Sequence, residues 1–428
     1  MSVAYIFIFL LLLIAGAPIV FALLIGPGLS LALDDQHQFY PAILARLYNG
    51  IDSFPLMAVP FFILAGELMN SGGVTAAIFR FAKAMIGHVR GGLAQVNIVT
   101  SMLFASLSGS AVADASAVGK MLVPEMVKEG YSRRYSAAVT AAAAILGPVI
   151  PPSGLMILYA FVMNVSVAAL FAAGAVVGVL MAGGLMLVTM ALAHRRGFPK
   201  AEREATWSER GKALTQTLPA LMTPVVLLGG VLSGAFTPTE AAAVACVYAL
   251  VVGIFIMRTL KVADLPRVFV TSAAQSGVVL LLVGAAVSFA WIVTVSGLAE
   301  SLAALLTGVT TDVYLLLLLV NLLLFIVGMF LDAGPAILIL GPVLGPMFVA
   351  LGVEPLHFAV VMCVNVTVGL ATPPMGLVLF VASSVSGEKP AAIALEMAPY
   401  LLMHASIIFL ITYAPAIVTT LPRMLGFA

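Results

Sequence analysis

A proline pair that interrupts an apolar segment occurs twice in this chain and constrains its fold more than any other feature. The first copy reads GPVIPPSGL at residues 147–155, and the second reads GLATPPMGL at residues 369–377. At one constant offset the first glycine, both prolines, the second glycine and the leucine coincide. Proline lacks an amide hydrogen and disfavours helical geometry in the residue before it, so a helix must open at each pair. The repetition indicates two related halves.

Composition places these helices in a membrane. Hydrophobic residues make up 63% of the chain and charged residues only 9%, whereas a soluble domain carries about 25% charged residues. Several apolar runs exceed the roughly 18 residues that mark a membrane span. The sequence therefore predicts an all-α polytopic membrane protein built as one body. The net charge of +1 gives no basis for nucleic-acid binding, and Cys246 and Cys363 lie in separate apolar runs, which predicts packing roles rather than metal binding.

Two further segments have a polar centre between apolar arms. The first centre is SLSGS at 106–110, followed by Asp114, and the second is GMFLDAGP at 328–335. Each arm has about 15 residues, too few to cross a ~30 Å hydrocarbon core. Each segment is therefore predicted to be a re-entrant helical hairpin with its tip at mid-depth. At a second constant offset Asp114 coincides with Asp332, which predicts equivalent positions for the two aspartates.

The other segments divide around these elements. Residues 3–33 are predicted to form one span, residues 34–50 an amphipathic connector, and residues 54–88 a crossing broken at Ser71-Gly72-Gly73. The resulting parts are a scaffold part at 1–90, the first hairpin and broken helix at 91–165, scaffold spans at 166–310 with basic linkers at 194–212 and 258–267, the second hairpin and broken helix at 311–387, and a last span (398–419) within 388–428. The linker 194–212 is predicted to hold a short surface helix.

The distribution of lysine and arginine predicts how the spans are oriented. Cytoplasmic loops are enriched in these residues, which places Arg90, Arg133 and both basic linkers inside. Residues 268–388 contain neither lysine nor arginine, as an outward-facing stretch should. The two hairpins then enter from opposite faces, which is an inverted-topology repeat. Arg46 and Arg423 are exceptions, because both would lie outside.

The two breaks offer partners to a cation and to an acid. An opened helix exposes carbonyl oxygens, which suit a hard cation such as Na⁺, and N–H groups, which suit a carboxylate. The first predicted sodium site consists of Ser106, Ser108, Gly109, Ser110, Gly147, Ile150 and Ser153. The second consists of Gly328, Asp332, Gly369, Thr372 and Pro373. The substrate is expected at Ser110, Asp114, Pro151, Pro152, Ser153 and Pro374.

Neither hairpin tip carries a lysine or arginine, although Lys120 lies further along the first return arm. An anionic substrate would therefore depend on helix ends, hydroxyls and co-bound cations, which predicts cation-coupled uptake. A matching pair of breaks in two related halves is typical of a transporter's binding site.

Each of these features also has a structural explanation. The serines could serve close helix packing. Charged residues at membrane depth are functional as a rule, but Asp114 and Asp332 could instead cap the hairpin turns. Glu240 follows Thr-Pro-Thr and is interpreted as a helix-start acid beside Thr237.

Other classes of protein are disfavoured by what the sequence lacks. Two aspartates could suggest a protease and Ser108-Gly109 a serine hydrolase, but no histidine is placed as the base. The sequence has no phosphate-binding loop either, so an enzyme is not expected. Opposed hairpins favour alternating access over a channel, the third class considered.

Five motifs together resemble the large membrane subunit of tripartite ATP-independent periplasmic (TRAP) transporters. They are PLMAVPFFILAG at 55–66, SGSAVADASA at 108–117, IPPSGL at 150–155, FTPTEAA at 236–242 and ATPPMGL at 371–377. The resemblance covers essentially the whole length. It implies a multi-pass protein of the bacterial inner membrane that transports rather than catalyses.

The resemblance implies an elevator mechanism, in which both hairpins and both broken helices slide as a transport domain against a scaffold. It implies Na⁺ as the coupling ion, one between each hairpin and its broken helix, and no other cofactor. It also implies two partners: a periplasmic binding protein that delivers an organic acid, and a small four-span membrane subunit, expected as a separate chain. The acid stays open among C4-dicarboxylates, sialic acid and other carboxylates. The alternative is a stand-alone divalent-anion/sodium symporter-like transporter that works without a binding protein.

Overall fold

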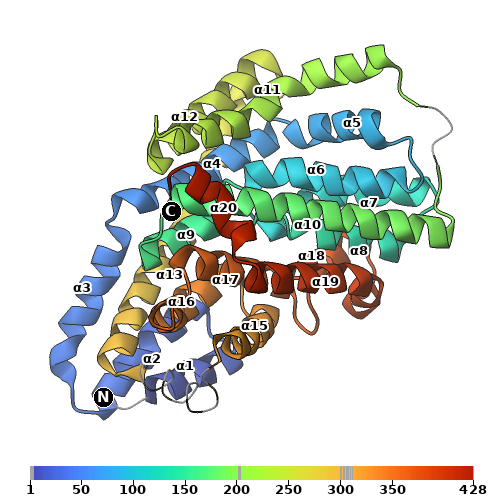
Figure 1. The fold of residues 1–428 in the computed structure, drawn as a ribbon. Helices are drawn as coiled ribbons and strands as arrows, with labels where there is room; N and C mark the ends of the chain where they lie inside the picture. Colours follow the sequence, from blue (N-terminus) through green and yellow to red (C-terminus); the bar gives the residue numbers. More distant parts are fainter. Residues whose placement is uncertain are drawn as a thin grey trace.

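The computed structural model describes residues 4–200, 204–298 and 312–427, together with residues 301, 304, 308 and 310. Within this part of the chain every regular element is helical (Figure 1). Eight of the described helices are long and apolar enough to cross a membrane, and six shorter apolar helices accompany them. The predicted all-α architecture with many spans is therefore confirmed.

The N-terminal apolar run forms two helices, so the prediction of a single span at residues 3–33 is wrong. Helix α1 (Ala4–Ile14) ends at a turn, and α2 (Ile19–Leu33) begins after Pro18. Gly16 in the turn has a φ of +82°, which glycine adopts without steric cost. The two helices then pack against each other.

The next elements form the scaffold around α13 (Leu265–Val295). The predicted amphipathic connector is α3 (Tyr40–Ile51), which packs along α13. The predicted break at residues 71–73 is present between α4 (Ala58–Ser71) and α5 (Val74–Ile86). Helix α4 also packs against α13. The crossing predicted to continue from α13 to residue 306 lies partly outside the described residues.

Two more scaffold helices flank the broken crossing. Helix α12 (Pro238–Val251), extended by a π-helical turn, packs against α4, and α11 (Trp207–Leu232) packs against α5. The linker 194–212 contains no separate surface helix among its described residues. Instead α10 (Val167–Arg196) and α11 extend into it from both sides.

The first hairpin and the first broken helix are both present. The hairpin consists of α6 (Gly92–Ser108) and α7 (Ala111–Lys128), whose arms pack against each other. The broken helix consists of α8 (Arg133–Ala144) and α9 (Gly154–Met163), separated by turns at residues 145–153. The helix therefore opens at the proline pair, as predicted.

The second unit repeats this order of elements. It consists of α15 (Val313–Phe330), α16 (Ala333–Ala350), α17 (Pro355–Gly369) and α18 (Leu377–Ser386). The second helix also opens at its proline pair, between α17 and α18. The arms α15 and α16 touch each other little, whereas α15 packs along α17. The second hairpin is therefore more open than the first.

A single offset of 222 residues relates the two units, as between Ala111–Lys128 and Ala333–Ala350. It also relates Gly147 to Gly369 and each proline pair to the other. One register therefore runs through hairpin and broken helix alike.

The single register changes the relation between the two aspartates. Ser110, the N-cap of α7, corresponds to Asp332, the N-cap of α16. Asp114 lies one turn further into α7 and corresponds to Ala336. The prediction that Asp114 and Asp332 occupy equivalent positions is therefore wrong, and the second offset was a chance match between neighbouring alanines and prolines.

The two units interlock through their return arms. Helix α7 packs against α18, and α16 packs against α9, so each return arm contacts the broken helix of the other unit. Gly119 on α7 faces Val385, and its equivalent Gly341 on α16 faces Tyr159 and Met163. Small residues let helices approach closely in apolar surroundings. The hairpins and broken helices therefore form one packed body.

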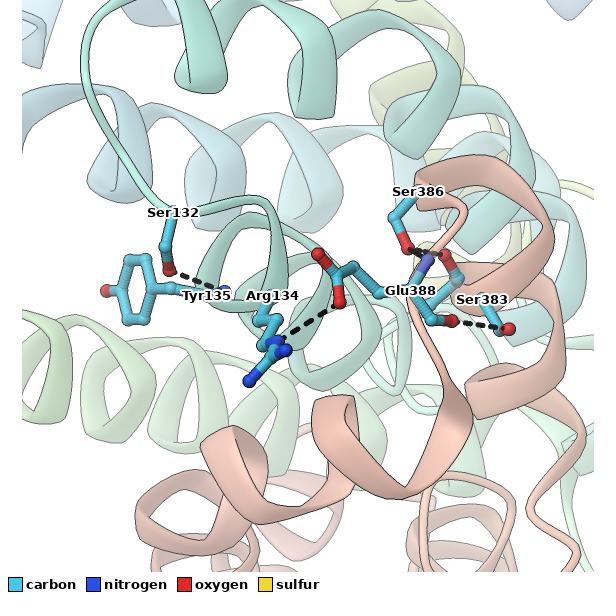
Figure 2. Close-up of polar contacts among 7 residues, drawn as sticks. Ser132, Arg134, Tyr135, Ser383, Ser386 and Glu388 are labelled. Carbon is cyan, nitrogen blue, oxygen red and sulfur yellow. Dashed lines mark hydrogen bonds and ion pairs between the residues drawn. The ribbon is translucent and has the colours of Figure 1, made fainter.

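The hairpins start from opposite ends of α19 (Pro390–Tyr413), a helix of 24 residues and so about 36 Å long. Just before its start, Glu388 pairs with Arg134, which follows the first hairpin (Figure 2). At its other end, the Tyr413 hydroxyl donates to the carbonyl of Tyr314, where the second hairpin begins. This arrangement agrees with the predicted inverted repeat.

The C-terminal part differs from prediction in its boundaries. The last long helix, α19, begins at Pro390 rather than near residue 398, and α20 (Ala416–Met424) follows it. Glu396 in the unexpected first turns pairs with Arg196 at 2.6 Å. Arg423 pairs with Glu354, at the start of α17, at 2.6 Å. That exception to the lysine and arginine pattern therefore has an acidic partner.

Candidate functional site

The first hairpin tip is held by its own side chains. Gly109 has a φ of +61° and ends α6, and Ser110 caps α7 by accepting from the N–H of Ala113 at 3.4 Å. The Ser108 hydroxyl donates to Oδ1 of Asp114 and accepts from the N–H of Ser110 at 3.3 Å. Asp114 therefore fixes the tip from within the hairpin.

This tip lies directly against the first break. A methyl group added to Gly109 would stand 3.2 Å from the carbonyl oxygen of Pro152, and one added to Gly147 would stand 2.7 Å from Oδ2 of Asp114 and 2.9 Å from the carbonyl carbon of Ser110. The structure therefore brings together the tip residues and the break residues that sequence reasoning grouped as the first sodium site.

The break itself leaves backbone oxygens without donors. The Ser153 hydroxyl donates to the Pro148 carbonyl at 2.5 Å and accepts from the N–H of Met156 at 3.2 Å, so it closes the loop and caps α9. Within the described chain, no hydrogen bond reaches the carbonyl oxygens of Gly147 and Ile150, two of the predicted ligands. An unwound segment with free carbonyls suits cation coordination.

Two other members of the first group lie differently. The Ser106 hydroxyl donates to the carbonyl of Leu103 in its own helix at 2.7 Å. The side chain of Ile150 points at Gly178 of α10, away from the tip. Only the backbone oxygen of Ile150 is therefore left for a ligand.

The second site is built on a contact between glycines. A methyl group on Gly369 would lie 2.6 Å from the backbone of Gly328, and one on Gly328 would lie 2.5 Å from the carbonyl oxygen of Val366. Any larger side chain would push α15 away from α17. Gly328 and Gly369, both predicted, are thus neighbours.

The remaining members of the second group are less closely assembled. The Thr372 hydroxyl donates to the Val368 carbonyl at 3.0 Å. Asp332 accepts from the N–H of Ala333 at 2.8 Å, and its side chain is exposed. Asp332 therefore acts as a helix cap, which was the structural explanation left open for it. Pro373 is exposed beside α19, where it lines an apolar cavity with Ala394.

The predicted substrate residues fall into two groups. Ser110 is partly exposed and Pro374 is exposed, whereas the side chains of Asp114, Pro151, Pro152 and Ser153 are buried. Asp114 has no exposed surface, and its Oδ2 has no hydrogen-bond partner within the described chain. Asp114 is not a cap of the hairpin turn, because Ser110 holds that role.

Sequence reasoning missed a buried polar network behind the second break. The side-chain amide of Asn321 donates to the Thr412 hydroxyl at 3.0 Å, and that of Asn365 donates to Oδ1 of Asn321 at 2.8 Å. The network joins α15, α17 and α19. Single asparagines inside otherwise apolar runs were the available signal.

Sequence reasoning also missed a polar cavity beside α7. Its walls come from the break between α4 and α5 and from the return arm that carries Lys120. No cluster of three or more histidine, cysteine, aspartate or glutamate residues that could hold a metal occurs in the described residues. The Glu240 interpretation is correct, since Thr237 and Glu240 cap α12 reciprocally.

Comparisons with known proteins give one consistent result. The family model described as "Tripartite ATP-independent periplasmic transporter, DctM component" matches residues 6–417. The sialic acid TRAP transporter large permease protein SiaM of Vibrio cholerae is 38% identical over 425 residues, covering 99% of this chain and 98% of SiaM. The C4-dicarboxylate TRAP transporter large permease protein DctM of Rhodobacter capsulatus is 36% identical over 398 residues, or 90% of each chain.

Among solved structures, the YdaH transporter of Alcanivorax borkumensis resembles this fold with a TM-score of 0.64 over 88% of each chain, at 18% identity. That likeness concerns the fold alone. The permease relatives and the eight candidate spans confirm a multi-pass protein of the inner membrane that acts in transport and not as an enzyme. By the match of its whole length, this chain belongs to the DctM family, the large membrane components of TRAP transporters.

Proposed function

We propose that this chain is the permease through which Na⁺ drives uptake of an organic acid, delivered by a periplasmic binding protein. The observation that carries the proposal is the contact between the first hairpin tip and the first break, where Gly109 meets Pro152 and Gly147 meets Asp114. Two opened backbones meet there beneath buried side chains, so an ion would find oxygens already in position.

The first sodium ion is assigned to this contact. The free carbonyl oxygens of Gly147 and Ile150 supply ligands, together with the backbone and hydroxyls of Ser108 and Ser110. The second ion is assigned to the equivalent place between Gly328, Gly369 and Thr372. Support for the second site is weaker in side chains and stronger in backbone, because two glycines bring the main chains of α15 and α17 into contact.

The acid is placed beside the ions at the exposed edge of the tips, near Ser110 and Pro374. No arginine or lysine lies at either tip, so a co-bound cation and the start of α9 would balance the carboxylate charge. The printed substrates of the two relatives, sialic acid and C4-dicarboxylates, are carboxylates. The specific acid is therefore proposed only as a carboxylate.

We further propose elevator transport, with residues 91–165 and 311–387 moving together against residues 1–90, 166–310 and 388–428. The interlocked packing of α7 with α18 and of α16 with α9 supports this division, because it ties the two repeats into one body. A small four-span membrane subunit is proposed as a partner of the scaffold.

The test is uptake into liposomes that contain this chain and its small subunit, with the binding protein outside loaded in turn with succinate or sialic acid. An inward Na⁺ gradient should drive accumulation, and replacing Na⁺ with K⁺ should abolish it. Equal uptake in both salts would refute Na⁺ coupling. Full uptake by this chain without binding protein would favour the stand-alone symporter instead.

A further inference from the structure

A cavity of about 430 Å³ lies between the scaffold and the first hairpin, outside the two predicted sodium sites. One wall is the α4–α5 break, with Asn70, Gly73 and Thr75, and the other is the face of α7 that carries Ser116 and Lys120. Residues 113, 116, 117 and 120 recur at helical spacing, so they form one face of α7. The opposite face packs on α8 and α18.

The charge in this cavity is positive and unbalanced. Lys120 has no ion pair within the described part of the chain, whereas the neighbouring Lys83 and Lys128 pair with Glu129 and Glu125 at 3.0 and 2.8 Å. No acidic residue lines the cavity. An unpaired lysine along a membrane hairpin is costly unless it faces water or a ligand, so its placement calls for an anion.

The opposite wall offers donors rather than acceptors. The Thr75 hydroxyl donates to Oδ1 of Asn70 at 3.3 Å, which leaves the amide nitrogen of Asn70 free to donate to a ligand. Gly73 starts α5 without a side-chain cap, so the first N–H groups of that helix carry partial positive charge beside the cavity. The alanines and Met121 of the lining supply an apolar wall for a carbon skeleton.

We propose that this cavity is a second anion site, which holds a carboxylate of the transported acid on its way from the hairpin tip to the membrane surface that carries Lys128. The inference rests on the proposed function, because it takes the ligand to be the transported acid. Lys120 lies ten residues, or about 15 Å, along α7 from the tip residue Ser110. A ligand here would be clear of the sodium sites and close to release.

The test measures the electrostatics of the cavity without transport. Ala117 lines the cavity beside Lys120 and is partly exposed, so Ala117→Cys places a thiol there. Cys246 and Cys363 are buried, and the unsubstituted chain supplies the blank. The full chain in detergent is labelled with an anionic sulfonate or a cationic trimethylammonium methanethiosulfonate reagent, and the ratio of the two rates is determined.

Lys120→Gln should lower the anionic-to-cationic ratio about tenfold, because one unit charge at about 6 Å in water changes each rate roughly threefold in opposite directions. The matched control is Lys128→Gln, which removes a lysine that already pairs with Glu125 and should leave the ratio unchanged. An unchanged ratio in the Lys120 variant would overturn the proposal.

Ligand identity is tested by protection of the same thiol. Succinate or sialic acid should slow labelling in the chain with Lys120 and fail to do so in the Lys120→Gln variant. In nanodiscs, protection by phosphatidylglycerol with no effect of either acid would assign the cavity to a lipid phosphate and overturn the carboxylate. Because labelling needs no gradient and no partner, Na⁺-driven uptake can stand while this inference fails, and the reverse.

Discussion

Gly147→Ala is the sharpest test of the contact between hairpin tip and break. The added methyl would stand 2.7 Å from Oδ2 of Asp114, 2.9 Å from the carbonyl carbon of Ser110 and 3.1 Å from the N–H nitrogen of Ala111. These distances fall about 0.3–0.7 Å short of the 3.4 Å at which ordinary contact begins. Because two of the three atoms belong to the backbone, the tip itself must move.

The strain has a definite cost and a matched control. Overpacking of this kind costs about 1–3 kcal/mol, and each 1.4 kcal/mol lost from binding is about a tenfold loss of affinity. Gly147→Ala should therefore raise the Na⁺ concentration for half-maximal uptake by about tenfold or more. Gly154→Ala alters the same break, but its methyl meets no atom within 4 Å, so it should leave the Na⁺ dependence unchanged.

The assay is initial uptake into proteoliposomes over a series of Na⁺ concentrations at constant ionic strength, with thermal unfolding of both variants measured in NaCl and in KCl. The expected pattern is loss of Na⁺-dependent stabilisation in Gly147→Ala alone. If both variants kept the same Na⁺ dependence as the unsubstituted chain, the tip and break would not form a sodium site.

Three other substitutions follow from the same geometry. Gly369→Ala should lower the unfolding temperature because its methyl meets the Gly328 backbone at 2.6 Å, whereas Gly183→Ala on α10, with no atom within 4 Å, should not. Asp114→Ala should destabilise by about 1–3 kcal/mol more than Asp114→Asn, since it leaves the Ser108 hydroxyl without its acceptor; equal losses in chemical unfolding would contradict this. Thr237→Ala should cost about 1 kcal/mol through loss of the α12 cap, with Na⁺ dependence unaffected.

Features fixed by neighbouring residues were predictable from the sequence. The two proline pairs forbid a continuous helix wherever they occur, and the Ser-Gly-Ser tip and Thr237–Glu240 cap depend on contacts within a few residues. The same local reading failed where an apolar composition hid a turn, as at Gly16 before Pro18. It also cut α19 short, because Glu396 looked too polar for a span until Arg196 supplied its partner.

Features that depend on distant packing could not be predicted. Nothing in the sequence of α7 shows that Gly119 meets Val385, some 266 residues away, or that Lys120 faces the break between α4 and α5. The interlocking of the two units and the polar cavity both arise from such contacts. A local pattern states which backbone must open, and only the fold states what stands opposite.

The single register also explains why the two sodium sites were recognisable despite different side chains. At the offset of 222 residues, Ser106 corresponds to Gly328, Ser110 to Asp332, Gly147 to Gly369 and Ile150 to Thr372. The candidates were chosen from each break separately, yet they occupy equivalent positions in the two units. What the positions share is backbone geometry, since serine faces glycine and isoleucine faces threonine. The part of each site that both halves retain is therefore the opened main chain, while Asp114 and Ser108, whose counterparts are Ala336 and Phe330, serve the first tip alone.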